Sequence, residues 1–459
     1  MAAVSGPTQE SKGPLFPVSD SLPGWLSKDN GSSLGREQIS GKSWEQGYSH
    51  TEQLSKSVKQ RKREVNAFLP IIAASYACHD LESEDLATFF RHYAHLYTVG
   101  IDTNAICNLS CGYCYLDAYN LNTTPQYADL RHFKKMLRDI IEKGVDLVAL
   151  VGKEPFADDR GIELLRFLDG LSGSGSDFRY GVVTNGTLID RYIDRLPSSM
   201  AYIDISLDGP EEINDSIRGS GVFKRAGQNM RALVDRGYEV WTSSVLHSSN
   251  STRRTLADFI KTVICEFGCA RFYFSPVRNF TGSLRPFLLS FEEIARVEDI
   301  LTELGESILG VESLILDHPY EAVWRDYFWP LGRGQNTRFQ QLVVDEYGNV
   351  LQKLSERCFQ KLDVFPHGPW GTCRVDARGT YLSDVESRTY SNPEGVGSIL
   401  EHSAHSLLAS ALQSQLTLML ERFLANMHSA SIAQPATPAL TSVSSPPMNN
   451  SRSTVAVYG

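Results

Sequence analysis

Two periods of hydrophobic and polar residues alternate through the middle of the chain. Short apolar runs, typical of buried strands, are separated by segments in which apolar residues recur every three or four positions, as on one face of a helix. The apolar runs predict strands over 97–102, 147–151, 180–183, 202–207, 238–246 and 271–275. The longer period predicts helices over 130–141, 161–171, 189–195, 223–236 and 254–267. About six strand–helix units in succession indicate an α/β fold with a parallel sheet, a partial or full (β/α) barrel.

Composition predicts additions on either side of this barrel. Residues 1–45 are rich in Ser, Gly, Pro and charge, which is typical of disorder. Residues 46–96 have a helical pattern and predict a helical N-terminal addition. The barrel is expected over 97–310 and a small C-terminal extension over 311–428. The Ser- and Pro-rich tail, 429–459, predicts disorder again.

Charge and cysteine use narrow the classes of function. The chain has 459 residues and a formal net charge of −10, which argues against nucleic acid as a partner because phosphate binding needs a basic surface. No basic segment followed by an apolar run opens the sequence, and no apolar run is long enough to cross a bilayer, so no membrane association is expected. Eight cysteines without the pattern of a disulfide framework predict a cytoplasmic protein.

Three of the cysteines are crowded directly after the first predicted strand. Cys107, Cys111 and Cys114 have C-x3-C-x2-C spacing, which suits three irons of a [4Fe–4S] cluster. An electron-transfer ferredoxin would supply a fourth cysteine nearby, but the next one is Cys265, so one iron would stay open for a small molecule. Buried core thiols and a zinc site are the alternatives. Structural zinc needs four ligands in tight pairs, and no second pair follows.

The ends of the next predicted strands carry polar motifs in a fixed order. They read Gly152-Lys-Glu-Pro155, Val183-Thr-Asn-Gly-Thr-Leu188 and Ser206-Leu-Asp-Gly-Pro210, the last followed by Arg218. Together with the cysteine trio, this order resembles radical S-adenosylmethionine (SAM) enzymes. Lys153 departs from that pattern, in which a second glycine is usual, and places a charge near the end of the site where the methionyl group is expected.

The resemblance implies two cofactors, one [4Fe–4S] cluster and S-adenosylmethionine, and an external electron donor such as flavodoxin or ferredoxin. The cluster ligands would be Cys107, Cys111 and Cys114. Glu154, with the backbone near Gly152 and Pro155, would meet the methionyl ammonium. Ser206 and Arg218 would hold the carboxylate, a role that suits the planar guanidinium. Asn185 or Asp208 would meet the ribose, and Tyr113 the adenine. The alternative is structural: Asn-Gly and Asp-Gly are ordinary turn dipeptides, and Arg218 could be a surface cation.

The C-terminal extension resembles a degenerate form of the SPASM/twitch extension of peptide-modifying radical SAM enzymes. Cys373-Arg-Val-Asp-Ala-Arg-Gly-Thr-Tyr-Leu-Ser383 follows that extension's hairpin, with Ser383 in place of a cysteine, and Gly395-Val-Gly-Ser-Ile399 matches the usual sequel. Only Cys358 and Cys373 remain there, so a second cluster is not expected unless Cys265 and Cys269 contribute.

A single cluster and an acidic chain favour a small-molecule substrate. The resemblance to single-cluster radical SAM enzymes that tailor natural products implies a sugar or cationic aminoglycoside intermediate of antibiotic biosynthesis, which would be dehydrated, deoxygenated or epimerised. An epimerase needs a hydrogen donor, for which Cys265, Cys358 and Cys373 are the candidates. The alternative is a peptide- or protein-modifying enzyme, and the remote alternative is a non-catalytic scaffold.

Overall fold

The computed structural model describes residues 98–114, 127–142, 145, 147–174, 176, 178–277, 287–318, 342–344, 350–362, 372–382 and 397–398. The strands are β1 (Thr98–Asp102), β2 (Leu147–Val151), β3 (Arg179–Thr184), β4 (Tyr202–Ser206), β5 (Val240–Leu246), β6 (Arg271–Pro276), β7 (Ser313–His318), β8 (Leu342–Val344), β9 (Val350–Lys353), β10 (Cys358–Leu362), β11 (Thr372–Val375), β12 (Thr380–Leu382) and β13 (Gly397–Ser398). The α-helices are α4 (Leu130–Glu142), α5 (Asp159–Ser172), α6 (Glu211–Arg218), α7 (Val222–Asp235), α8 (Arg253–Thr262) and α9 (Phe291–Ser307).

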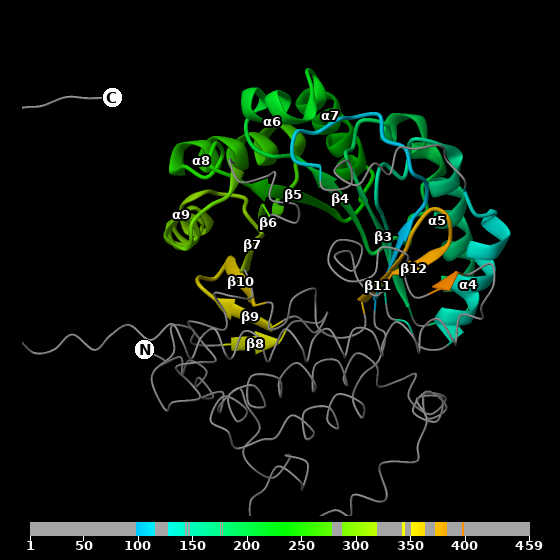
Figure 1. Ribbon diagram of the computed structural model, residues 1–459. Helices are drawn as coiled ribbons and strands as arrows, with labels where there is room; N and C mark the ends of the chain where they lie inside the picture. Colours follow the sequence, from blue (N-terminus) through cyan, green and yellow to red (C-terminus); the bar gives the residue numbers. More distant parts are fainter. Residues whose placement is uncertain are drawn as a thin grey trace, which may run out of the picture.

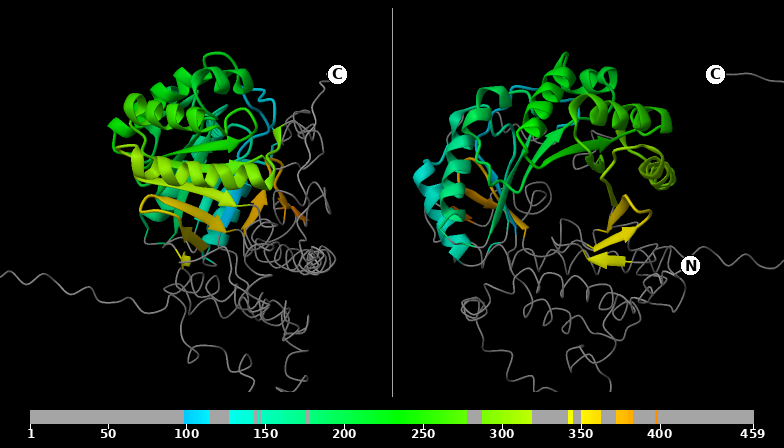
Figure 2. Two further views of the ribbon diagram at one scale, coloured as in Figure 1. Left: turned by 90° about the vertical axis from the view of Figure 1, so that its left-hand side faces the viewer. Right: turned by 180° about the vertical axis from the view of Figure 1, so that it is seen from behind.

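These strands form one curved sheet, in the order β13-β12-β11-β1-β2-β3-β4-β5-β6-β7-β10-β9-β8. The run from β11 through β1–β7 to β10 is parallel throughout. Helices α4 to α9 cover its convex side, as Figures 1 and 2 show from three directions. In the described part of the chain β10 and β11 do not pair with each other, and each continues into an antiparallel hairpin. The barrel is therefore partial, one of the two forms that the sequence predicts.

The core lies between the sheet and the helices. Successive side chains of a strand point to opposite faces. On β4, Ile203 and Ile205 are almost fully buried in the core, so Tyr202, Asp204 and Ser206 face the concave side. On β5 the same alternation buries Thr242 and Ser244 and leaves Ser243 and Val245 on the concave side. The concave face is thus polar, and the loops after the strands lie at one end of it.

Most predicted elements are present, with three differences. The helix predicted over 189–195 consists of two short 3-10 helices, Ile189–Arg191 and Ile193–Arg195, because the repeated Ile-Asp-Arg segments are too short for a stable α-helix. Helix α6, which the hydrophobic pattern did not predict, begins after Pro210 with Glu211 and Glu212 in its first turn. Strand β7 extends the parallel sheet beyond the last predicted strand, and helix α9 precedes it in the chain.

Several predictions lie outside the described residues. They are the disordered regions 1–45 and 429–459, the helical addition 46–96 and most of the segment 395–399. Within the described part, no helix has the length and apolar character needed to span a membrane.

Candidate active site

The three clustered cysteines lie in the loop that follows β1. Cys107, Cys111 and Cys114 are free and half-buried. Two hydrogen bonds shape the loop locally: Leu109 N–H donates to Cys107 Sγ (3.4 Å) and Cys114 N–H donates to the Cys111 carbonyl (3.0 Å). Gly112 N–H reaches the carbonyl of Ile217 in α6 (3.1 Å), which fastens the loop to the far side of the site.

The chemistry of this donor set fits an iron–sulfur cluster. Burial raises the pKa of Cys107, and burial raises that of Cys111 to about 11, with a further contribution in both cases from the neighbouring Cys114. Positive irons would favour the thiolate forms that burial disfavours. No three metal-binding side chains in the described part converge on a single ion. A four-iron cube does not require this, because each iron takes its own cysteine.

Glu154 lies directly behind this loop and is fully buried. Its Oε1 accepts hydrogen bonds from Thr184 Oγ1 (2.7 Å) and Phe156 N–H (3.1 Å), and its Oε2 accepts one from Asn185 N–H (2.8 Å). Burial raises the pKa of this carboxyl despite the three donors. The backbone of Glu154 also pairs with the cysteine loop, since its N–H donates to Ile106 O (3.1 Å). Glu154 therefore joins the ends of β1, β2 and β3.

Asn185, after β3, makes the contact with the first cysteine. Its Nδ2 lies 3.8 Å from Cys107 Sγ and 2.9 Å from Asn108 Oδ1. Its Oδ1 accepts from both the backbone and the hydroxyl of Thr187. The structure thus turns the amide of Asn185 toward the cysteine loop; its predicted contact with ribose stays a prediction.

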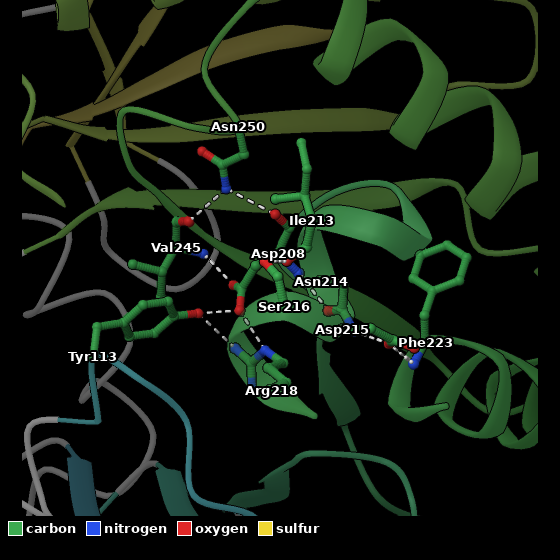
Figure 3. Close-up of polar contacts among 10 residues, drawn as sticks. All are labelled: Tyr113, Asp208, Ile213, Asn214, Asp215, Ser216, Arg218, Phe223, Val245 and Asn250. Atoms are coloured by element: carbon green, nitrogen blue, oxygen red, sulfur yellow. Dashed lines mark hydrogen bonds and ion pairs between the residues drawn. The ribbon is translucent and has the colours of Figure 1, made fainter. Parts of the chain in front are cut away.

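Asp208, Arg218 and Tyr113 form a buried polar cluster across the ends of β4 and β5 (Figure 3). Asp208 Oδ2 accepts from both Tyr113 Oη and Arg218 Nε, and Arg218 Nη2 lies 3.2 Å from Tyr113 Oη. Val245 N–H donates to the other oxygen of Asp208 (2.9 Å). Burial alone would lower the pKa of Arg218, but Asp208 reverses this and holds it well above its ordinary value. Arg218 is accordingly no surface cation.

Two asparagines hold the backbone around this cluster. Asn214 Oδ1 accepts from Asp208 N–H (3.0 Å), and Asn250 Nδ2 donates to the carbonyls of Asp208 and Val245 (2.8 Å each). Asp215 accepts from the N–H groups of Gly221 and Phe223 at the start of α7. All of these contacts are visible in Figure 3 except that to Gly221.

His247 lies one residue beyond β5 and is fully buried. Its ring is 6.1 Å from that of Tyr113 and 6.0 Å from that of Phe287 between centroids. Nδ1 accepts a hydrogen bond from Ser249 N–H (3.2 Å). Burial lowers the pKa of the imidazole. Because Nδ1 accepts a hydrogen bond, the proton of the ring lies on Nε2.

The remaining residues predicted to bind the cofactor lie at the same end of the sheet. Gly152 has φ 103° and approaches Asp102 so closely that a Cβ would lie 2.7 Å from its Oδ1, which explains the glycine. Pro155 is buried in the same turn. Ser206 is half-buried at the end of β4, opposite Ser243 of β5.

The structure does not bring the three candidate hydrogen donors to this site. Cys265 is exposed on the helical layer, within the π-helical turn Val263–Phe267. Cys358 is fully buried at the start of β10, beside Leu314, and burial raises its pKa to about 12. Cys373 pairs with Val99 near the start of β11. Cys358 and Cys373 are thus near the strand ends opposite the cysteine loop, and no position favours a donor role. Cys269 is a core thiol bonded to Thr242 Oγ1 (3.3 Å).

The sequence reasoning did not identify several residues that shape the site. Thr184 binds Glu154, Asn104 Nδ2 donates to the Glu154 carbonyl (2.8 Å), and Asn108 Nδ2 donates to Thr187 Oγ1 (2.8 Å). Each follows or ends a strand, as His247 does. A polar residue at the carboxyl end of a parallel strand was the signal available for all four.

Comparison with known proteins agrees with this geometry. Residues 101–263 match the family model of the radical SAM superfamily. The span runs from the end of β1 to the end of α8 and includes all three cysteines, Glu154, Asp208 and Arg218. The chain therefore carries a radical SAM domain. This superfamily uses a [4Fe–4S] cluster and S-adenosylmethionine, the two cofactors predicted from the sequence.

Individual relatives match smaller parts. The Fe-coproporphyrin III synthase of Methanosarcina barkeri is 27% identical over 147 residues, 31% of this chain and 35% of the relative. The serine-type anaerobic sulfatase-maturating enzyme of Bacteroides thetaiotaomicron is 26% identical over 202 residues, 39% and 47% of the two chains. The chain thus spans about a third to a half of the length of these relatives. The crystal structure of Streptococcus suis SuiB bound to the precursor peptide SuiA has the same fold, with a TM-score of 0.51, 14% identity and coverage of 71% of this chain and 68% of that one.

Proposed function

We propose that this protein is a radical SAM enzyme that cleaves S-adenosylmethionine reductively and abstracts hydrogen from a substrate held on the concave face of the sheet. One observation carries the proposal. Three free cysteines lie in one loop at the carboxyl end of β1, and hydrogen bonds fasten that loop to the residues after β2, after β3 and in α6.

The residues of the chain have distinct roles in this proposal. Cys107, Cys111 and Cys114 hold the cluster, which when bound supplies the electron that splits the cofactor into methionine and a 5′-deoxyadenosyl radical. Glu154 and Asn185 keep the strand-end loops in register around it. An external reductant supplies that electron to the cluster, as radical SAM chemistry requires.

The direct test is cluster assembly and cofactor cleavage under anaerobic conditions. We expect about four irons per chain after reconstitution, because three cysteines serve one cube, and 5′-deoxyadenosine with dithionite. Cys107→Ala should abolish the product. Ser110→Ala is the matched control, because Ser110 is exposed in the same loop and is not a ligand. Undiminished cleavage by C107A contradicts the cluster assignment; four irons without any cleavage favours the non-catalytic scaffold.

For the substrate, we favour a peptide or protein side chain. The sulfatase-maturating relative and the peptide-bound structural neighbour support this choice, and the concave face carries half-buried polar residues such as Ser206 and Ser243. The similarity to Fe-coproporphyrin III synthase does not support a peptide substrate. A sugar or aminoglycoside substrate, with dehydration or epimerisation, stays a prediction from charge and analogy.

Isotope transfer separates these substrates. A candidate peptide or aminoglycoside deuterated at the reacting carbon should pass deuterium to 5′-deoxyadenosine, and the substrate that does so is identified. About eight irons per chain instead of four would indicate an auxiliary cluster as in peptide-modifying enzymes.

A further inference from the structure

His247 has an unused hydrogen-bond donor inside the site. The side chain is fully buried, and its Nε2 has no hydrogen-bond partner in the described part of the chain. A buried polar atom without a hydrogen-bond partner destabilises the fold. A bound ligand can supply the missing hydrogen-bond partner of such an atom.

The tautomer of this ring is fixed by the backbone. Ser249 N–H donates to Nδ1, which must therefore be the unprotonated nitrogen. The proton then resides on Nε2, so the unused atom is a donor and requires an acceptor. His247 N–H also donates to Asn250 Oδ1 (2.8 Å), which holds the residue in place beyond the end of β5.

The position of the ring points to the cofactor. In β5, Ser243 and Val245 face the concave side, and His247 continues this alternation. Its ring lies against that of Tyr113, the residue before the third cluster cysteine, and Tyr113 in turn binds Asp208 and Arg218. Phe287 covers the pair from another side, edge-on to His247.

We propose that His247 is a positioning residue that donates a hydrogen bond from Nε2 to an acceptor atom of bound S-adenosylmethionine. This inference rests on the proposed function, because it presupposes that the cofactor binds beside the cysteine loop. The end of β5 then has two roles: Val245 N–H binds Asp208, and His247 binds the cofactor. The sequence motifs did not include either residue.

The test compares variants that separate the two ring nitrogens. His247→Asn keeps an acceptor for Ser249 N–H but does not reach the Nε2 position, whereas His247→Gln places an amide N–H there. His247→Phe keeps the aromatic packing against Tyr113 and has no donor. His132→Phe is the control, because His132 is exposed on α4.

The readout is the affinity of the reconstituted protein for S-adenosylmethionine, measured by equilibrium dialysis without reductant, with iron content as the check on folding. We expect about tenfold weaker binding for H247N and H247F, near-original binding for H247Q and no change for H132F, since tenfold corresponds to about one good hydrogen bond. Binding by H247N and H247F equal to that of the original protein overturns the inference, and the Nε2 partner is then a water molecule. Should H247F not retain its iron, H247N against H247Q decides. A protein with four irons that does not bind the cofactor at all contradicts the proposed function instead.

Discussion

The ends of β2 and β3 and the ends of β4 and β5 each enclose a buried carboxylate, but they satisfy it in different ways. Glu154 receives three hydrogen bonds from neutral donors, and no ion pair with it is present among the described residues. Asp208 receives a buried guanidinium, a phenol and a backbone N–H. Both carboxylates join neighbouring strand ends, so the same structural task is done once with neutral donors and once with a charge pair.

This difference predicts which substitutions in each half of the site lower the stability of the fold most. A buried carboxylate held by neutral donors is costly because of its own burial, which is why the pKa of Glu154 is raised. Breaking a buried ion pair costs more than removing both partners, because one unpaired charge is then left buried without water. The half with Asp208 should therefore tolerate the loss of both partners far better than the loss of one.

The largest expected effect is that of Arg218→Met. The change leaves Asp208 buried without its cation, which should lower the free energy of unfolding by about 3–5 kcal/mol. Urea unfolding measures this loss. The double variant D208N/R218M should recover a large part of it, because neither charge is then buried.

The control for that prediction is Arg225→Met. Arg225 forms an ion pair with Asp190 at 3.4 Å, with both side chains about half exposed. Exposed pairs contribute at most about 1 kcal/mol. Equal losses in R218M and R225M would contradict the distinction between the buried pair and an exposed one.

In the other half, we expect a smaller effect from Glu154→Gln. The amide keeps the shape of the carboxylate, but its NH2 group must face either Asn185 N–H or the donors on Oε1, so one donor loses its acceptor. Such a loss costs about 1–3 kcal/mol. Urea unfolding measures it, and Glu163→Gln, at a half-exposed position of α5, is the control. A cost above that of R218M would reverse the comparison.

The alternation of strand and helix could be predicted because it depends on local periodicity. The bounds of β2 were predicted to the residue, and β1 to within one. Helix α9 begins with a Ser290–Glu293 capping box, a signal that the sequence did contain. The C-terminal strands β10 and β11 flank the parallel sheet by pairing with β7 and β1. Pairing between strands so far apart in the sequence has no local sequence signal, so these two neighbours could not be predicted.

For the site, motifs identified which residues gather but not what each one touches. Glu154, Asn185 and Asp208 do lie together with the cysteine loop, as their places after strand ends predict. Arg218 joins them from the end of α6. That Asp208 and Arg218 pair with each other, and that the Asn185 amide faces Cys107, depends on rotamers and loop paths set by the packed fold. The fully buried His247 lacked a motif, so only the three-dimensional neighbourhood of β5 reveals it.

The smallest expected effect concerns Asp204, which lies four residues before Asp208 and forms no ion pair among the described residues. Ser243 Oγ donates to its Oδ2 (2.5 Å), while Oδ1 is buried without a hydrogen-bond partner in the described part of the chain. Burial raises the pKa of Asp204 to about 6, above the value expected in the unfolded chain. The folded state therefore holds more protons between these two values, and this group's contribution to stability falls as the pH rises through about 4 to 6.

Asp204→Asn keeps the acceptor for Ser243 and removes the titration. Between pH 5 and pH 8 the original protein should lose about 1 kcal/mol of unfolding free energy relative to D204N. Urea unfolding at both values measures the difference, and Glu142→Gln, exposed at the end of α4, should show no such relative change. An identical difference between D204N and the original protein at pH 5 and pH 8 would mean that Asp204 is as well compensated as Asp208, and that an enclosed carboxylate on this strand does not need a cation.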